Sequence, residues 1–169
     1  MSIEIICPKF WTYRTKNPRI KSKAAEGKLP LSYLDKYEYT HIHGELIISI
    51  DGRPVPHLGY KDDVCIGYWV NELVKLFTAF KANRITYIIY GNDQGHPNYK
   101  FEKEKGDVFL SIIESELGGK RDPNWQRILF DYKEFKDAFE QFKELLLCEI
   151  ELQAPDMVNY WNEAFYQGN

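Results

Sequence analysis

The sequence predicts an α+β fold, in which a mostly antiparallel sheet is covered on one face by two or three helices. Segments with alternating apolar and polar residues are joined by connections of hairpin length, as in antiparallel sheets. Two longer segments instead repeat apolar residues at helical spacing. Because few strand–helix–strand crossovers intervene, the expected order is β-β-α-β-β-β-β-α-α. A chain of 169 residues fits one domain, residues 1–169.

The first two strands are predicted within the first 50 residues. The run Ile3–Cys7 is short and apolar, and residues 15–30 form a polar, basic loop interrupted by prolines. Residues 37–50 are predicted to form one long strand, because its apolar residues share one parity: Ile42, Leu46, Ile48 and Ile50. Asp51-Gly52 then supplies a turn. Pro54 and Pro56 favour an edge strand or a loop after it.

A helix is predicted next, because apolar residues form a single stripe: Ile66, Val70, Leu73, Val74, Phe77 and Phe80. Asp62 or Asp63 is expected to cap its N-terminus, where a carboxylate accepts backbone N–H bonds and meets the positive end of the dipole.

After this helix come segments in which apolar residues recur at every second position, as in strands. Residues 85–90 are rich in β-branched and aromatic side chains, which favours a strand. Residues 99–103 and 107–113 flank Lys105-Gly106 and are predicted to form a hairpin. Residues 126–131 supply the last strand.

The strongest helical pattern lies near the C-terminus, with apolar residues at Phe135, Ala138, Phe139, Phe142, Leu145, Leu146 and Ile150. Asp131 is expected to cap this helix, with Glu134 three residues later as in a capping box. Ala154-Pro155 ends it. A short amphipathic helix is then expected from Asp156.

Composition excludes several classes of protein. The net charge is −3, and no apolar run approaches the roughly 18 residues of a membrane span. The three cysteines include no CxxC pair, so we expect reduced thiols in a cytoplasmic protein rather than a zinc ribbon or a redox motif. The N-terminus lacks the pattern of a signal peptide. The high aromatic content, 15%, indicates an aromatic core or an aromatic contact surface.

Charge is unevenly distributed along the chain. Residues 1–36 hold eight basic and three acidic side chains, whereas residues 134–163 hold eight acidic and two basic ones. This asymmetry indicates either a charged binding face or mutual attraction between the two ends.

The best candidate for chemistry is the segment His41-Ile42-His43-Gly44-Glu45. On a strand His41, His43 and Glu45 point to one face, and two imidazoles with a carboxylate can bind a divalent metal. The alternative is the ordinary polar outer face of an antiparallel sheet. We therefore expect no metal and no other cofactor, and keep a metal-dependent enzyme using these three residues as the alternative function.

Other catalytic patterns are absent from the sequence. No GxSxG, Walker or dinucleotide-binding motif occurs. His57 and His96 are expected in loops. Cys65 lies near the start of the first helix, where the dipole can lower a thiol pKa, but core or surface placement is equally compatible with its position. We therefore assign no catalytic residue.

Nucleic-acid binding would have to use residues 9–28, where basic side chains lie close to Phe10, Trp11 and Tyr13. The sequence pI of about 5.8 argues against a general affinity for phosphates. We expect neither nucleic acid nor a membrane as a partner.

Two segments carry a resemblance. Residues 43–52, HGELIISIDG, are followed by WVNEL at 69–73, and residues 125–135 read WQRILFDYKEF before a Phe-rich helix. Over residues 38–152 this pattern resembles small bacterial cytoplasmic domains, some of which are immunity proteins encoded beside polymorphic toxins. The resemblance implies a non-catalytic protein-binding domain whose partner is another protein, such as a toxin.

An immunity protein of this kind would act by occlusion. An acidic, aromatic-bearing face would cover a basic active site on the toxin, and charge would speed association. The candidate partner-binding residues lie in the acidic C-terminal region and are Glu140, Glu144, Glu151, Asp156, Tyr160 and Trp161.

Overall fold

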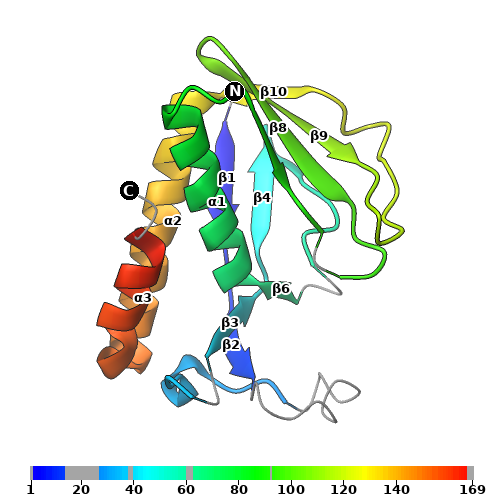
Figure 1. Cartoon of the computed structure of the whole chain (residues 1–169). Helices are drawn as coiled ribbons and strands as arrows, with labels where there is room; N and C mark the ends of the chain where they lie inside the picture. The colour runs from blue at the N-terminus through cyan, green and yellow to red at the C-terminus, as the bar shows by residue number, and fades with distance from the viewer. Residues whose placement is uncertain (1, 14–26, 38–39, 60–62, 92, 167–169) are drawn as a thin grey trace.

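The computed structural model describes residues 2–13, 27–37, 40–59, 63–91 and 93–166, and confirms the predicted mixture of helices and antiparallel strands (Figure 1). Its α-helices are α1 (Ile66–Lys81), α2 (Tyr132–Gln153) and α3 (Val158–Tyr166). Two short 3-10 helices are η2 (Leu31–Tyr33) and η3 (Pro155–Met157). Most of the loop predicted at 15–30 lies outside the described residues.

The strands form three antiparallel sheets instead of the single sheet that we expected. Their bounds are β1 (Ile3–Ile6), β2 (Phe10–Tyr13), β3 (His41–Gly44), β4 (Ile47–Ile50), β5 (Arg53–Pro54), β6 (Val64–Cys65), β7 (Thr86–Ile89), β8 (Asn98–Glu104), β9 (Asp107–Ile113) and β10 (Ile128–Asp131). The strand orders are β1-β4-β5, β2-β3-β6 and β10-β9-β8-β7. Every strand pair is antiparallel, as the sequence predicts.

The long strand predicted at 37–50 is two strands in different sheets. Strand β3 pairs with β2 and β6, whereas β4 pairs with β1 and β5. The chain bends at Gly44, which packs so closely on Cys7 and Lys9 that a Cβ atom would overlap Sγ of Cys7. The parity prediction is nevertheless correct, because the side chains of Ile42, Leu46, Ile48 and Ile50 are all buried.

The turn after β4 follows the sequence prediction. Asp51 and Gly52 have φ values of 49° and 74°, the left-handed pair that a two-residue hairpin loop requires. Pro54 lies in β5, which is an edge strand of its sheet, where a residue without an N–H is tolerated.

The start of α1 differs from the prediction. The helix begins at Ile66 with Cys65 at the N-cap, and no side chain caps it. Asp63 lies just before β6 and bonds to other side chains, while Asp62 lies outside the described residues. The cap prediction is therefore wrong for Asp63, because the two residues of β6 separate it from the helix.

The cap of α2 is confirmed. The Asp131 carboxylate accepts a hydrogen bond from the backbone N–H of Glu134 at 2.8 Å. Strand β10 runs directly into this cap, so the chain passes from the four-stranded sheet into the helix without a loop.

Many aromatic side chains lie in the core, beside a larger number of aliphatic ones, as the first of the two interpretations of the aromatic content predicts. All four tryptophans are at most 8% exposed. The ring of Phe77 on α1 lies 4.9 Å from that of Phe135 and 5.3 Å from that of Phe139, both on α2. Leu145, predicted to join the buried stripe of α2, is instead 62% exposed.

The three helices lie together on one side of the molecule, with the β7–β10 sheet on the other (Figure 1). Helix α2 contacts β1, which belongs to the sheet β1-β4-β5. Helix α1 contacts β3 of the sheet β2-β3-β6 and β7 of the four-stranded sheet, so it packs against both. No helix in the described ranges combines the length and apolar character needed to cross a membrane.

Candidate metal centre

The candidate site lies on the small sheet β2-β3-β6, at the start of α1. The register pairs Tyr13 with His41 and pairs His43 with both Trp11 and Cys65 on its two neighbours. Since side chains alternate along a strand, His41 and His43 lie on one face of β3, as predicted. Their ring centroids are 6.2 Å apart.

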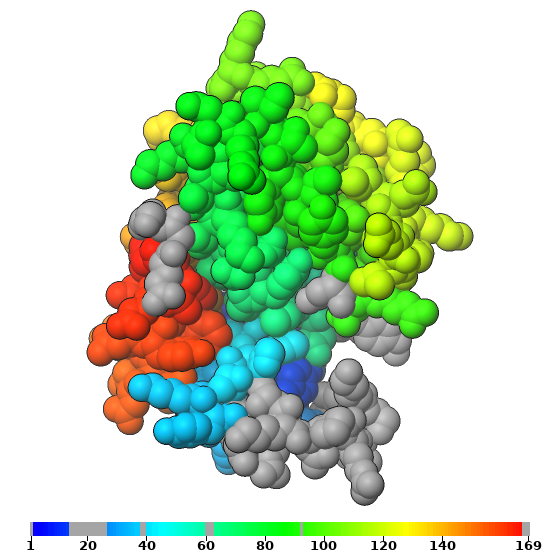
Figure 2. All heavy atoms as spheres, in the orientation of Figure 1, coloured from blue at the N-terminus to red at the C-terminus, as the bar shows by residue number. Residues whose placement is uncertain are grey.

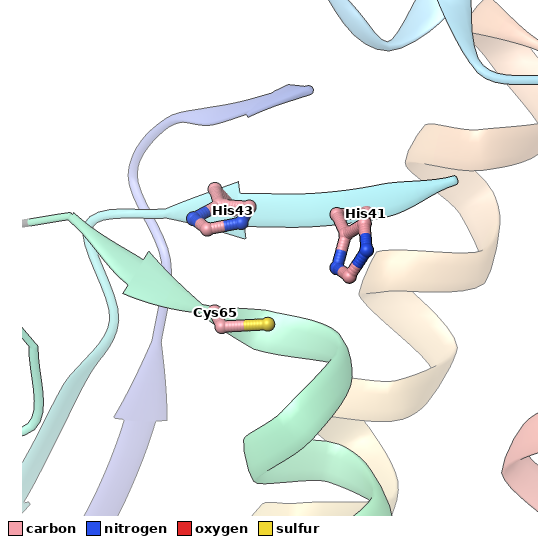
Figure 3. Close-up of side chains that lie close together, drawn as sticks. All are labelled: His41, His43 and Cys65. Atoms are coloured by element: carbon pink, nitrogen blue, oxygen red, sulfur yellow. The ribbon is translucent and has the colours of Figure 1, made fainter. Parts of the chain in front are cut away.

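His41, His43 and Cys65 bring three potential ligand atoms together. One atom from each residue lies within 4.8 Å of the other two. Figure 3 shows both imidazoles on β3, facing the thiol at the point where β6 passes into α1. Ligands on a tetrahedral zinc ion are about 3.3–3.6 Å apart, given bond lengths of about 2.0–2.3 Å. A closing movement of about 1 Å would therefore bring this triplet to zinc-binding distances.

Asp63 fixes the orientation of His43. Its Oδ1 lies 2.9 Å from Nδ1 of His43, and its Oδ2 accepts a hydrogen bond of 2.7 Å from the Tyr13 hydroxyl. A carboxylate accepts only, so Nδ1 carries a proton, and in the neutral imidazole the lone pair is on Nε2. Metal-binding histidines are commonly held in this tautomer by a carboxylate behind them.

The electrostatics favour a charged Asp63. Burial raises its pKa, but the hydrogen bonds from His43 and Tyr13, together with the positive charges of His43 and Lys28, hold the pKa below its usual value. Burial and then the charge of His43 lower the pKa of His41, so its imidazole is kept in the neutral form that binds metals.

Cys65 is protonated unless a cation replaces its proton. Burial raises the pKa of the thiol, and this effect exceeds the lowering by backbone N–H groups at the start of α1. The position of Cys65 at the start of α1 therefore does not lower the pKa of its thiol. A metal ion held by His41, His43 and Cys65 would supply the missing positive charge, since a coordinating thiol is deprotonated.

Glu45 does not belong to the cluster, contrary to the predicted triplet His41, His43 and Glu45. Strand β3 ends at Gly44, so the alternation that would place Glu45 beside the histidines is broken. The Glu45 side chain forms an ion pair with Lys9 at 3.6 Å, and its backbone N–H bonds to the Lys9 carbonyl. Cys65, from β6, takes the third position instead.

The remaining histidines and cysteines lie away from the cluster. His57 and His96 are in loops, as predicted. Burial raises the pKa of the Cys7 thiol to about 12, and Cys148 is exposed on α2.

The predicted partner-binding residues lie on α2, η3 and α3, and the structure separates them by exposure. Glu144, Glu151, Asp156 and Tyr160 are exposed, and Glu140 is half-buried. The Trp161 side chain is only 8% exposed and packs against Phe165, so it belongs to the core rather than to a contact surface.

The basic segment at 9–28 lies mostly outside the described residues. Of its described cations, Lys9 pairs with Glu45, and the Lys28 ammonium lies 3.9 Å from the centre of the Trp11 ring. Lys9 and Lys28 of this segment therefore each contact a side chain of the protein itself.

Sequence reasoning missed Asp63 and Cys65 as parts of one site with His43. The signal was present, because residues 63–65 alternate polar, apolar and polar in the same way as residues 41–43. In both segments the middle residue, Ile42 or Val64, is buried. Two such segments paired in register place their polar residues on a common face.

No protein-family model, no curated protein and no solved structure matches this chain significantly. The resemblance to immunity proteins consequently stays a prediction.

Proposed function

We propose that this protein binds a divalent transition-metal ion, zinc in the first instance, through His41, His43 and Cys65. The convergence of two imidazoles and a thiol within 4.8 Å is the observation that carries this proposal. The carboxylate of Asp63 behind His43 adds the outer-shell partner that such sites use.

The donor set selects the class of metal. Nitrogen and sulfur ligands suit zinc and its neighbours in the first transition row, whereas magnesium and calcium need oxygen ligands. The cytoplasmic location expected from the cysteine pattern would keep the Cys65 thiol reduced and available. His41 is exposed, so a fourth position on this side would be open to water or to a substrate. Three protein ligands and one open position are the arrangement of catalytic zinc sites.

The experiment uses protein whose affinity tag has been removed, titrated with Co²⁺ and with Zn²⁺. Thiolate ligation gives Co²⁺ a charge-transfer absorption in the near ultraviolet, which reports Cys65 directly. We expect one equivalent to bind, with loss of the signal in Cys65→Ser and weaker binding in His41→Ala and His43→Ala. The matched controls Cys148→Ser and His57→Ala remove the same side chains elsewhere and should bind as wild type.

Two results would reject the proposal. One is no saturable charge-transfer band in wild-type protein. The other is a band that survives Cys65→Ser and disappears in Cys148→Ser, which would place the thiolate on α2.

A second proposed function is protein binding through the exposed face of α2, the activity expected of an immunity protein. Glu144 and Glu151 are exposed and seven residues apart, which places them on one side of the helix. Beside them Leu145 and Leu152 are 62% and 80% exposed. An acidic row next to an apolar row fits a basic partner with an apolar patch, because charge speeds encounter and leucine burial adds affinity.

Affinity purification from the native host tests this second function. Wild-type protein should retain a partner that Glu144→Lys/Glu151→Lys and Leu145→Ser/Leu152→Ser both lose. Glu114→Lys/Glu116→Lys makes the same charge change on an exposed loop and should retain it. A partner held equally by all four proteins would place the contact away from α2.

A further inference from the structure

A groove about 450 Å³ in volume lies between α1, α2 and the last residues of α3. Figure 1 shows these three helices together on one side of the molecule, and in Figure 2 the surface of α1 borders that of α3. Lys103 of β8 adds a residue of the β7–β10 sheet to the lining. The groove lies toward Lys81, at the opposite end of α1 from Cys65. A helix of 16 residues spans about 24 Å, so the groove is separate from the candidate metal centre.

Positive side chains dominate the charged lining of the groove. Lys81, Lys103, Lys136 and Lys143 line it, against the single carboxylate of Glu140. Within the described part of the chain, Lys81, Lys103 and Lys136 form no ion pair with a carboxylate. Like charges gathered at one concave surface raise the local potential, which an anion would relieve.

Lys143 is the most informative of the four. Its side chain is only 5% exposed, although lysine is rarely buried without full pairing. Among the residues that the structure describes, its carboxylate partner is Glu140 at 2.8 Å, and that side chain is 42% exposed. The ammonium also lies 4.3 Å from the centre of the Tyr166 ring and 5.1 Å from that of Phe139. An ammonium has three donors, so Lys143 keeps donor capacity at the wall of the groove.

Most of the uncharged lining is aromatic, beside Val74, Thr78 and Asn83. It includes Phe77, Phe80, Tyr132, Phe139, Phe165 and Tyr166. The Lys103 ammonium lies over the Tyr132 ring, 4.1 Å from its centre, so a cation and an aromatic ring are in contact in the groove. This combination suits a ligand that has both a flat apolar body and an anionic group.

We propose that this groove binds a small organic anion consisting of an aromatic or other flat apolar body with a phosphate, sulfonate or carboxylate group. The aromatic lining takes the body of the ligand, and Lys103, Lys136 and Lys143 take the anion. The volume lies within the range of about 300–1,000 Å³ for small-molecule sites. The proposal is independent of the metal centre, because the two sites share no residue.

The test uses 8-anilinonaphthalene-1-sulfonate, a fluorescent aromatic anion, with N-phenyl-1-naphthylamine as the same ring system without the sulfonate. Wild-type protein should bind one equivalent of the sulfonate saturably and bind the uncharged analogue at least tenfold more weakly. Lys103→Gln/Lys136→Gln should weaken sulfonate binding by about 10–100-fold, since each charge-assisted contact is worth about tenfold. Lys133→Gln/Lys120→Gln removes two lysines outside the groove and should change binding less than twofold.

Lys103 and Lys136 are at least partly exposed, so their substitution should leave folding intact, as thermal unfolding would verify. Chemical-shift changes on wild-type protein give a second measurement that needs no variant, and they should centre on Val74 and Tyr166 in the groove lining. Equal affinity for both dyes, equal binding by the two double variants, or shift changes elsewhere would overturn the proposal.

Discussion

Replacing Asp63 with Asn tests whether the carboxylate orients His43 for metal binding. Asp63 lies 2.9 Å from Nδ1 of His43 and accepts a 2.7 Å bond from the Tyr13 hydroxyl. Asparagine has the same size and keeps one acceptor oxygen, but it loses the charge and one acceptor. The change therefore leaves the packing in place and weakens the control of the imidazole.

The size of the effect follows from these two hydrogen bonds. The Asp63 and His43 side chains are 23% and 22% exposed, so the pair is partly screened by water. Hydrogen bonds to a charged group contribute about 1.5–3 kcal/mol and neutral ones about 0.5–1.5 kcal/mol. We expect the free energy of unfolding of metal-free protein to fall by about 1–2 kcal/mol. Loss of an outer-shell partner should weaken zinc binding by about 10–100-fold.

Zinc affinity is measured by competition with a chromophoric chelator, and stability by urea unfolding of metal-free protein. Tyr13→Phe is the matched control, because it removes the hydroxyl and leaves the carboxylate on His43. Its zinc affinity should fall less than that of Asp63→Asn. If Asp63→Asn binds zinc as wild type while His43→Ala does not bind, Asp63 does not position the ligand and the reasoning fails.

Three further predictions concern stability and thiol reactivity. Asp131→Ala should lower the free energy of unfolding by about 1 kcal/mol, because it removes the side-chain cap of α2, as urea unfolding would measure. Iodoacetamide should modify exposed Cys148 first, with Cys65 and Cys7 slower because burial raises the pKa of both thiols, as mass spectrometry would show. Gly44→Ala should cost at least about 1–3 kcal/mol, because the new methyl group overlaps Sγ of Cys7. A Gly44→Ala protein as stable as wild type would contradict the proposed cause of the bend.

Local patterns predicted those parts of the fold whose determinants are close in sequence. The Asp131 side chain accepts a hydrogen bond from the backbone N–H of Glu134, only three residues later in the chain. The Lys105-Gly106 hairpin joins strands β8 and β9, which are adjacent in the chain and pair over their full lengths. In such elements the turn chemistry and the residue periodicity act together, so sequence alone is sufficient.

The bend at Gly44 depended on contacts that no local pattern contains. The stretch from Tyr37 to Ile50 has its buried isoleucines and leucine at even positions, and the glycine within it does not by itself show where the strand ends. Close packing on Cys7 and Lys9, some 35 residues earlier, leaves no room for a side chain at Gly44. The interpretation of Glu45 as a ligand failed for this reason, since it assumed that alternation continued through the bend.

The candidate metal centre shows why half of a site can be predicted while its chemistry is not. Alternation alone correctly placed His41 and His43 on one face of β3. The third donor depended on register, because the pairing of His43 with Cys65 is made by a strand of only two residues. A shift of one residue would put buried Val64 opposite His43 and turn the thiol away. Since the helical stripe of α1 begins at Ile66, burial of that stripe holds Cys65 in place, so the position of the thiol depends on the core as much as on the sheet.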